Sequence, residues 1–455
     1  MELRPYQMEL ACDVLSAFEN TARTIVVVLP TGGGKSAVLS YILTHEPGNV
    51  WVMAHRQELI WQLSETVGRF KIPHGIVKSG VQFDPTQRVQ IASVQTLVRR
   101  HHLLPEPALI VTDECHHVTA ATYRRILDSY PRARILGVTA TPCRTNGQGL
   151  GEVFEHMIVG PSNKWLTEQG FLSPAEYYAP PMVADTSGLH LRAGDFAKEE
   201  TEQIMDKPTV TGDAVEHYRN ICDGVPMLVF CTSVAHAKHV SEQYCLEGYR
   251  AASVDGSMTD EDRKDRIQGL GTGRYQIITS CDLIGEGLDV PVVGAVQLLR
   301  PTASLGLHLQ QLGRGLRPAP GKSHTTVLDH VSNVRRHGFA STVHEWTLSG
   351  SVKRKSVPAL RTCERCFLAH EPAPVCPACG YEYPRKERAL NRIETVEGKL
   401  VKIEETKEER QEAMRSAKSL VELIAFAKAR GYKSPAFWAR KVFFGRNHIQ
   451  KMPRV

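Results

Sequence analysis

Residues 24–40 read TIVVVLPTGGGKSAVLS, and this stretch decides the fold. Its apolar run from Ile25 to Leu29 predicts a strand buried on both faces, and the segment from Ala37 to Ile42 predicts a helix. Three glycines stand between them and are followed by Lys35 and Ser36. A strand, a glycine-rich turn and a helix in this order are typical of a phosphate-binding loop.

The loop offers the groups that a polyphosphate needs. Glycines let backbone N–H groups wrap the phosphates, the helix N-terminus adds positive potential, Lys35 reaches the terminal phosphates, and the Ser36 hydroxyl ligates magnesium. Leu29 stands where the general pattern G-x-x-x-x-G-K-[ST] has its first glycine, so a plain glycine-rich turn is the alternative. The residues predicted to bind the nucleotide here are Thr31, Gly32, Gly33, Gly34, Lys35 and Ser36.

Length and composition predict a multidomain protein inside the cell. A chain of 455 residues exceeds one core and predicts two or three domains. No apolar run approaches the roughly 18 residues of a membrane span, and MELRPYQMEL at the N-terminus has no signal-peptide core. Seven of the eleven cysteines are scattered without a pairing rhythm. We therefore expect a cytoplasmic protein with no membrane partner and no disulfides.

The positive charge is concentrated at the C-terminal end. Residues 351–455 hold 23 Lys or Arg and 12 Glu, a net charge of +11, whereas residues 1–350 hold 32 basic and 37 acidic residues, a net charge of −5. A polyanion such as nucleic acid is the natural partner of the basic quarter. A solvated helix face is the alternative, because most of these charges alternate in sign.

A second candidate strand, from Ala108 to Val111, leads into Asp113 and Glu114. Further apolar runs at Val50 to Ala54 and Val89 to Ala92 alternate with helical patterns. This rhythm predicts a parallel, doubly wound sheet whose loops gather at the strand C-termini. Phosphoryl transfer depends on positioning and charge neutralisation, so Asp113 is predicted to hold magnesium through water and Glu114 to orient or deprotonate the attacking water.

Five segments, in order, resemble motifs Q, I, Ia, II and III of superfamily 2 helicases of the DEAD/DEAH type. They are LRPYQ, PTGGGKS, AHRQEL, DECH and VTATP. The resemblance implies ATP as the nucleotide, Gln7 as a contact to the adenine edge, and coupling of nucleotide state to strand engagement through Thr139 to Thr141. LRPYQ and AHRQEL are most similar to the repair, recombination and phage branched-DNA helicases, which favours DNA over RNA.

Residues 216–345 are predicted to form a second lobe that has no phosphate loop of its own. Strands are expected at Met227 to Cys231 and Ala251 to Val254, and Thr259 with Asp262 predicts a capping box at a helix start. The segment TSCDLIGEGLDVPVV resembles motif V. That resemblance implies that Asp289 contacts the ribose and that Gly285 to Gly287 face the nucleic-acid backbone.

The segment HLQQLGRGLRP, residues 308–318, resembles motif VI with its pattern QxxGRxxR. Gln310, Gly313, Arg314 and Arg317 occupy the fixed positions. A spacing of three places both arginines on one face of a helix, from which they reach the interlobe cleft as arginine fingers. The predicted catalytic residues are Glu114, Gln310, Arg314 and Arg317. Arginines that only cap a helix end are the alternative.

Four late cysteines form two CxxC pairs: Cys363 with Cys366, and Cys376 with Cys379. Nine residues separate the pairs, a spacing that is typical of a zinc ribbon. Four thiolates bind zinc tetrahedrally and leave no open position for chemistry, so the zinc is predicted to be structural. Disulfide pairing is the alternative.

The last segment predicts two helices. Leu420, Leu423, Ile424 and Ala427 fall at helical spacing, Gly431 ends that helix, and Ser434 with Pro435 starts another that carries Phe437, Trp438 and Phe443. Aromatic residues at helical spacing usually pack in a core, which favours packing over base stacking. Arg440, Lys441, Arg446 and Lys451 remain candidates for phosphate contacts.

These predictions combine into an α/β protein with two RecA-like doubly wound parallel-sheet lobes. The expected domains are lobe 1 at residues 1–158, an interlobe connector at 159–215, lobe 2 at 216–345, a basic linker and zinc ribbon at 346–384, and a charged helical linker with a basic helical module at 385–455. We expect a monomeric ATP-dependent DNA helicase or translocase that remodels branched or duplex DNA, with ATP, magnesium and structural zinc. The alternatives for the function are an RNA helicase, a motor subunit or an ATP-switched nucleic-acid-binding clamp. The alternative for the tail is that it binds a protein partner.

Overall fold

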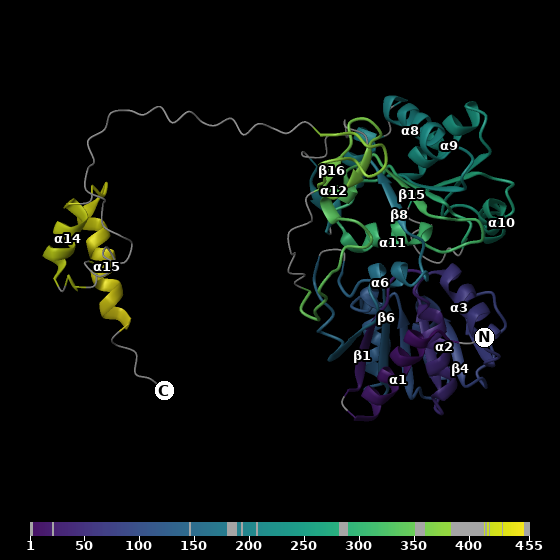
Figure 1. Ribbon diagram of the computed structural model, residues 1–455. Helices are drawn as coiled ribbons and strands as arrows, with labels where there is room; N and C mark the ends of the chain where they lie inside the picture. The colour runs from purple at the N-terminus through teal and green to yellow at the C-terminus, as the bar shows by residue number, and fades with distance from the viewer. Residues whose placement is uncertain are drawn as a thin grey trace. The chain divides into compact units, whose positions relative to one another are not determined.

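The computed structural model describes most of the chain. The described residues are 3–20, 22–144, 147–179, 189–192, 194–205, 208–281, 290–350, 360–383, 414, 416–417, 419–429 and 431–449. The chain divides into two compact units, Met1–Tyr383 and Pro384–Val455 (Figure 1). None of the described helices is long and apolar enough to cross a membrane.

Lobe 1 is built on a seven-stranded sheet in the order β3-β4-β2-β5-β6-β1-β7. Every neighbouring pair in it runs parallel, as the sequence predicts. The strands are β1 (Thr24–Val28), β2 (Val50–Ala54), β3 (His74–Val77), β4 (Val89–Ser93), β5 (Leu109–Asp113), β6 (Arg134–Thr139) and β7 (His156–Val159). The α-helices are α1 (Pro5–Asn20), α2 (Lys35–His45), α3 (Gln57–Arg69), α4 (Val94–Arg100) and α5 (Ala121–Ser129).

Lobe 2 contains an eight-stranded sheet in the order β12-β13-β11-β14-β15-β8-β17-β16. Its strands are β8 (Ala175–Tyr178), β11 (Met227–Phe230), β12 (Ala251–Val254), β13 (Ile277–Ser280), β14 (Ala295–Leu298), β15 (Thr325–Asp329), β16 (Arg361–Thr362) and β17 (Leu368–His370). The helices are α6 (Asn163–Glu168), α7 (Lys198–Met205), α8 (Pro208–Cys222), α9 (Val234–Leu246), α10 (Asp260–Gly271), α11 (Leu305–Gly315) and α12 (Asn333–His337). A short hairpin, β9 (Leu191–Arg192) with β10 (Asp195–Phe196), precedes α7.

The segment expected to be a connector, residues 159–215, contributes directly to lobe 2. Its strand β8 pairs in parallel with β15, with Ala175 opposite Thr325. This pairing gives β8 the place beside β15 that β1 has beside β6 in lobe 1. The sequence of this strand, AEYY, lacks the continuous apolar run of the other central strands, which is why its pattern did not reveal it.

The zinc-ribbon segment also joins the lobe 2 sheet. Strand β17 runs antiparallel to β8, with Leu368 opposite Tyr178, and β16 pairs with β17. We expected residues 346–384 to form a module beside the motor. The structure instead uses β17 to pair the backbone groups on the outer edge of β8, which otherwise would be an open sheet edge.

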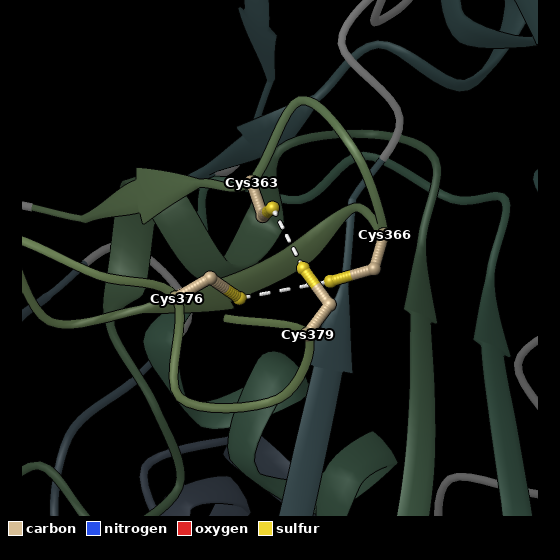
Figure 2. A group of neighbouring side chains, drawn as sticks. All are labelled: Cys363, Cys366, Cys376 and Cys379. Atoms are coloured by element: carbon tan, nitrogen blue, oxygen red, sulfur yellow. Dashed lines mark hydrogen bonds between the residues drawn. The ribbon is translucent and has the colours of Figure 1, made fainter. Parts of the chain in front are cut away.

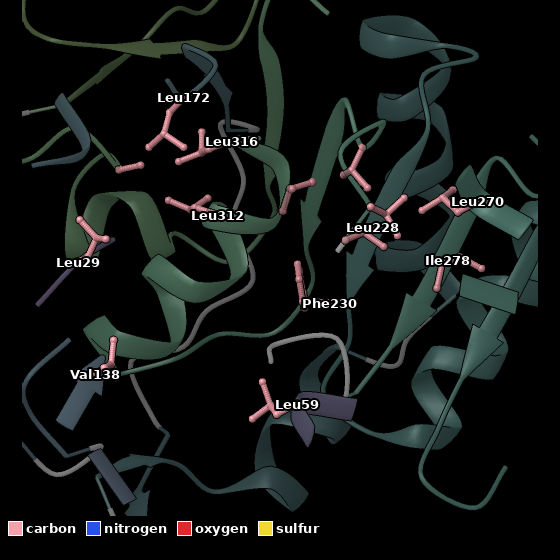
Figure 3. Packing of buried hydrophobic residues seen from close by; sticks show 14 of the residues in the cluster. Leu29, Leu59, Val138, Leu172, Leu228, Phe230, Leu270, Ile278, Leu312 and Leu316 are labelled. Atoms are coloured by element: carbon pink, nitrogen blue, oxygen red, sulfur yellow. The ribbon is translucent and has the colours of Figure 1, made fainter. Parts of the chain in front are cut away.

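The core of lobe 1 lies on both faces of its sheet. Side chains alternate along β1, so Ile25 and Val27 belong to one apolar cluster and Val26 to another. The first cluster also includes residues of lobe 2, among them Leu312 and Leu316 (Figure 3). Apolar burial near 25 cal/mol per Å² therefore stabilises the lobes and also their contact.

The predicted capping residue of α10 is confirmed. The Asp262 N–H donates to Thr259 Oγ1 over 3.1 Å, which satisfies one of the free donors at the helix start. The Thr259 hydroxyl in turn donates to the Asp262 carboxylate over 2.7 Å.

The C-terminal unit contains a helix pair, α14 (Leu420–Ala429) and α15 (Pro435–Ile449), as predicted. Gly431 lies between them with φ of 68°, a backbone conformation that glycine adopts without strain. The interior of the pair includes Leu423 and Ala439, both fully buried. The Trp438 ring stacks on Tyr432, with the ring centroids 4.9 Å apart, so this aromatic residue packs as predicted.

Candidate functional site

The glycine-rich loop is held in place by the N-terminal helix. Gly32 and Gly34 have φ of 86° and 89°, which favours glycine at both positions. The Tyr6 hydroxyl donates to the Gly33 carbonyl over 2.7 Å, and Gln7 Nε2 donates to the same carbonyl over 3.1 Å. A Cβ on Gly34 would lie 2.1 Å from Gln7 Nε2, so the close approach requires glycine.

The acidic pair lies at the carboxyl end of β5, beside the loop. Asp113 ends the strand, and Glu114 comes next with φ of 47° and ψ of 53°. A non-glycine residue in this left-handed region costs roughly 1–3 kcal/mol, a strain typical of functional sites. Glu114 Oε1 lies 2.9 Å from Lys35 Nζ, and both side chains are largely buried. His116 Nδ1 lies 3.5 Å from the second Glu114 oxygen.

A cavity of about 500 Å³ opens between the loop and lobe 2, within the size range of ligand sites. Lobe 2 contributes Pro291, Arg314, Arg317 and Pro318 to its lining. The predicted site residues that line it are Gln7, Thr31, Gly32, Gly34, Lys35, Ser36, Asp113, Glu114, Arg314 and Arg317. Two described residues of the prediction, Gly33 and Gln310, are not part of this lining, and Gln310 is buried within α11. Asp289 and Gly285 to Gly287 lie outside the described residues.

Helix α11 brings Arg314 to the cavity by packing on lobe 1. The prediction that both arginines share one helix face is wrong, because α11 ends at Gly315 and Arg317 reaches the cavity from the segment after it. A Cβ on Gly313 would lie 2.5 Å from the Thr31 side chain, and one on Gly306 would lie 3.0 Å from Thr141 Oγ1. Glycine at both positions therefore permits close contact with the phosphate loop and with the segment after β6. The sequence pattern identifies Gly313 but gives no signal for Gly306.

Thr139 links the end of β6 to the acidic segment. Its hydroxyl oxygen accepts from the Thr141 N–H over 3.1 Å and lies 3.5 Å from His116 Nδ1. Because His116 also contacts Glu114, these contacts connect the Thr139–Thr141 segment to the Glu114 carboxylate.

Sequence reasoning missed Lys322, which holds the segment that carries Arg317. Lys322 Nζ donates to the carbonyl oxygens of Val293 over 2.6 Å, of Arg317 over 2.8 Å, and of Gly315. Burial lowers the pKa of the Lys322 ammonium group to about 8, and the Arg317 charge contributes to the same shift. A lysine that satisfies the last carbonyls of a helix is a known capping device. In the sequence it is only one of many basic residues.

Two further residues to which the sequence analysis gave no role also line the cavity. Arg4 and Phe70 contribute to its wall, and the Arg4 guanidinium lies 4.5 Å from the centre of the Phe171 ring. A planar cation and an aromatic ring are groups on which a nucleobase can stack.

The cavity provides the oxygen ligands that magnesium prefers. Ser36 and Asp113 line it together, next to Lys35 and Glu114. A hydroxyl and a carboxylate are hard ligands suited to magnesium, which also takes phosphate oxygens and water. The residues therefore fit a magnesium–nucleotide complex, which would neutralise charge on the transferred phosphoryl group.

The four predicted zinc ligands converge in the ribbon (Figure 2). Their sulfur atoms all lie within 4.8 Å of one another, with 3.6 Å between Cys363 and Cys379 and 3.7 Å between Cys366 and Cys376. A tetrahedron with zinc–sulfur distances near 2.3 Å has sulfur–sulfur edges of about 3.8 Å, so the arrangement fits zinc. Separations of this size exclude disulfide bonds.

The Cys363 thiol already favours ionisation. Burial opposes it, but backbone N–H groups of Cys366 and Arg365 and the neighbouring thiols lower its pKa to about 6. The Arg365 N–H lies 3.4 Å from the Cys363 sulfur. Thiolates are the form that binds metal, so this environment suits a metal ligand.

Comparisons with known proteins match both lobes. Residues 1–144 match the family described as "Type III restriction enzyme, res subunit", and residues 213–319 match "Helicase conserved C-terminal domain". A 51.5 kDa protein of a Lactococcus phage is 32% identical over 368 residues, covering 79% of this chain and 78% of that protein.

Two more distant matches extend this picture. The putative ATP-dependent helicase IRC3 of Saccharomyces cerevisiae is 25% identical, over 72% of this chain and only 51% of that protein, so the chain spans about half of this relative. A fragment of a putative HsdR subunit of a type I restriction enzyme from Vibrio vulnificus YJ016 has the same fold, with a TM-score of 0.59 at 19% identity over 77% of this chain and 67% of that chain.

The two lobes, the phosphate loop and the paired arginines define an ATP-dependent motor of two RecA-like lobes. The chain belongs to the superfamily 2 helicases and is an ATP-dependent helicase of that superfamily.

Proposed function

We propose that this helicase couples ATP hydrolysis in the interlobe cavity to movement along DNA, and that it unwinds or remodels branched or duplex DNA. The observation that carries the proposal is that both lobes line the same cavity. Lys35 and Glu114 come from lobe 1, and Arg314 and Arg317 come from lobe 2. A site shared in this way is complete only when the lobes are closed, so hydrolysis and lobe movement depend on each other.

The residues have distinct roles in the proposed reaction. Lys35, which pairs with Glu114 at 2.9 Å, transfers its contact to the terminal phosphate when ATP binds. The Glu114 carboxylate is then available to orient the attacking water and accept its proton. Arg314 and Arg317 stabilise the negative charge that develops on the transferred phosphoryl group. Ser36 and Asp113 are the residues that would hold magnesium.

Several observations support DNA over RNA. The LRPYQ and AHRQEL segments are most similar to the DNA repair and recombination helicases. Two of the matches, one to a family model and one to a solved structure, carry the description of a restriction-enzyme subunit. An RNA helicase is the second candidate.

ATP turnover measured with different polynucleotides tests this proposal. Single-stranded DNA, duplex, fork, four-way junction and RNA are compared at equal nucleotide concentration, with strand displacement followed in parallel. We expect the largest stimulation by branched or duplex DNA. Stimulation by RNA alone would reject the DNA assignment, and turnover without displacement or fork movement would favour an ATP-switched clamp.

A pair of variants tests the assignment of the catalytic residues. Glu114→Gln should abolish turnover and leave ATP binding largely intact, whereas Lys35→Ala should lose both. Glu106→Gln, an exposed change in the same lobe, is the control and should behave as wild type. Turnover retained in both site variants would reject the assignment.

We also propose that the four cysteines bind one structural zinc ion. Their mutual distances support it, and a metal without an open coordination position would serve folding rather than catalysis.

A further inference from the structure

The last part of the sequence carries a more concentrated charge than the basic quarter as a whole. From residue 413 to the C-terminus the sequence holds ten Lys or Arg and one acidic residue, Glu422, whereas residues 351–412 hold 13 basic and 11 acidic residues. Alternating charges therefore dominate only the first part of the basic quarter. The excess of positive charge belongs to the segment that contains the pair α14 and α15.

The single acidic residue of this segment has a structural role. The Glu422 carboxylate accepts from the Ser419 N–H over 3.3 Å, and the Glu422 N–H donates to Ser419 Oγ over 3.2 Å. This reciprocal arrangement is a capping box at the start of α14. Glu422 therefore has a capping role in α14, and its single negative charge leaves the ten cations of the segment in large excess.

Neighbouring aromatic residues on α15 have opposite environments. Trp438 lies in a stack with Phe426 and Tyr432, with ring centroids 5.8 Å and 4.9 Å from its own. Phe437 is 74% exposed. We expected the aromatic residues of this helix to form a core, and this expectation is wrong for Phe437 because its ring is largely exposed to solvent.

Cations flank the exposed ring on the same helix face. Arg440 and Lys441 come three and four residues after Phe437, a spacing that places all three side chains on one side of a helix. Both are exposed, as is Lys433 in the turn before the helix. One exposed aromatic ring is ordinary on a protein surface, but a ring with two cations beside it is suited to a ligand that has both planar faces and negative charge.

We propose that Phe437, Arg440 and Lys441 form a binding face for single-stranded nucleic acid, in which the ring stacks on an unpaired base and the two cations contact phosphates. A duplex offers phosphates but keeps its base faces stacked, so the exposed ring favours the unpaired strand. The proposal rests on the proposed function in one respect: it gives the motor a second contact on the strand that unwinding produces.

Equilibrium binding of the full-length protein, measured by fluorescence anisotropy without nucleotide, tests this proposal. The probes are an oligo(dT) strand, an abasic strand of the same length, and a duplex. Phe437→Ala should weaken oligo(dT) binding by about fivefold to a hundredfold, the range of one base–aromatic stack, and leave abasic binding and the salt dependence unchanged. The exposed Val421→Ala change on α14 is the matched control and should have no effect.

The cations should give the complementary signature. The double variant Arg440→Ala and Lys441→Ala should lower the slope of log K against log salt by about 1.4 units, on oligo(dT) and on the abasic strand alike, because each phosphate contact contributes about 0.7 on single strands. Phe437→Leu keeps apolar volume without a ring face and should resemble Phe437→Ala.

Three outcomes would overturn the proposal. Phe437→Ala with unchanged oligo(dT) affinity would exclude stacking, and an equal loss on the abasic strand would show that the ring acts on the fold. Wild-type oligo(dT) affinity of Phe437→Leu would indicate an apolar contact instead of a base stack. The binding measurements contain no ATP and do not depend on the motor. If DNA failed to stimulate ATP turnover, the proposed function would be rejected, but the binding results for Phe437, Arg440 and Lys441 would still test this proposal.

Discussion

The two lobes share an arrangement of strands and differ in the side chains that each contributes to the shared cavity. Strand β1 lies between β6 and β7 in lobe 1, and β8 lies between β15 and β17 in lobe 2. After β1 comes the loop with Gly32, Gly34 and Lys35, which line the cavity, whereas lobe 2 sends Arg314 and Arg317 from α11 and its C-terminal end. The fold therefore provides two equivalent platforms, and in the proposed function their side chains share one catalytic site.

The outer edges of the two sheets also differ. In lobe 1 the neighbour of β1 is the parallel strand β7, but in lobe 2 the neighbour of β8 is the antiparallel ribbon strand β17. Tyr178 of β8 packs against the cysteine cluster. The proposed zinc site thus supports the sheet that carries the arginines, a role that the sequence did not suggest.

The largest expected effect tests whether lobe 2 takes part in ATP hydrolysis. Arg317→Ala should lower kcat by about 10³ or more with little change in stability, because an arginine finger acts on transition-state charge. Arg274→Ala, an exposed arginine of lobe 2 that pairs with Asp265, is the control. Steady-state ATPase assays and thermal melts check both; wild-type turnover in Arg317→Ala would mean that lobe 1 acts alone.

Because strand β17 of the ribbon pairs with the edge of the lobe 2 sheet, loss of the metal should destabilise lobe 2. Cys376→Ser should reduce zinc content from one ion per chain to near zero, and lower the melting temperature by about 5 °C or more, because the metal-binding energy is also folding energy. Increased hydrogen exchange should extend into β8. The exposed Cys245→Ser change is the control. Unchanged exchange in β8 would restrict the role of the ribbon to the ribbon itself.

Acid should destabilise lobe 2 before lobe 1. Burial lowers the pKa of His308 to about 3, with a contribution from His337, and burial lowers the pKa of His330 to about 3, with a contribution from His217. The unfolded chain takes up these protons first, so stability is lost as pH falls from about 6.5 towards 3, by about 2 kcal/mol per group at pH 5. Hydrogen exchange at pH 7 and pH 5 measures this for each lobe.

A substitution isolates one of these two groups. His308→Gln removes one titrating ring and should reduce the acid sensitivity of lobe 2 by about half. If lobe 1 opened first, or if the variant remained as sensitive as wild type, buried histidines would not be the cause.

The smallest expected effect concerns the support of Arg317. Lys322→Met should lower kcat about tenfold at similar KM for ATP, because the segment that carries Arg317 loses the ammonium group that ties it to Val293. The effect should be modest, since the Gly315 and Arg317 carbonyl oxygens keep the hydroxyl donors of Thr325 and Ser173. Lys322→Arg should recover part of the loss. Lys264→Met on α10, an exposed change, is the control. A change in KM alone would show that Lys322 contributes to binding and not to positioning.

The sequence by itself determined the elements whose signal is local. The phosphate loop, the strand β2, the cap of α10 and the two C-terminal helices result from glycine conformations, apolar runs and capping residues within a few positions of each other. The same holds for the four cysteines, because metal-ligand spacing is a local pattern.

Only the tertiary structure decided which distant segments meet. β8 has no apolar run, and its membership of lobe 2 depends on pairing with β15, about 150 residues later in the chain, and with β17 beyond it. Lys322 differs from other lysines only because the chain folds it onto the end of α11, and Phe437 differs from Trp438 only because one side of α15 is covered by α14. Burial and pairing between distant residues are properties of the folded chain, since local sequence sets propensity but not the partner that each surface finds.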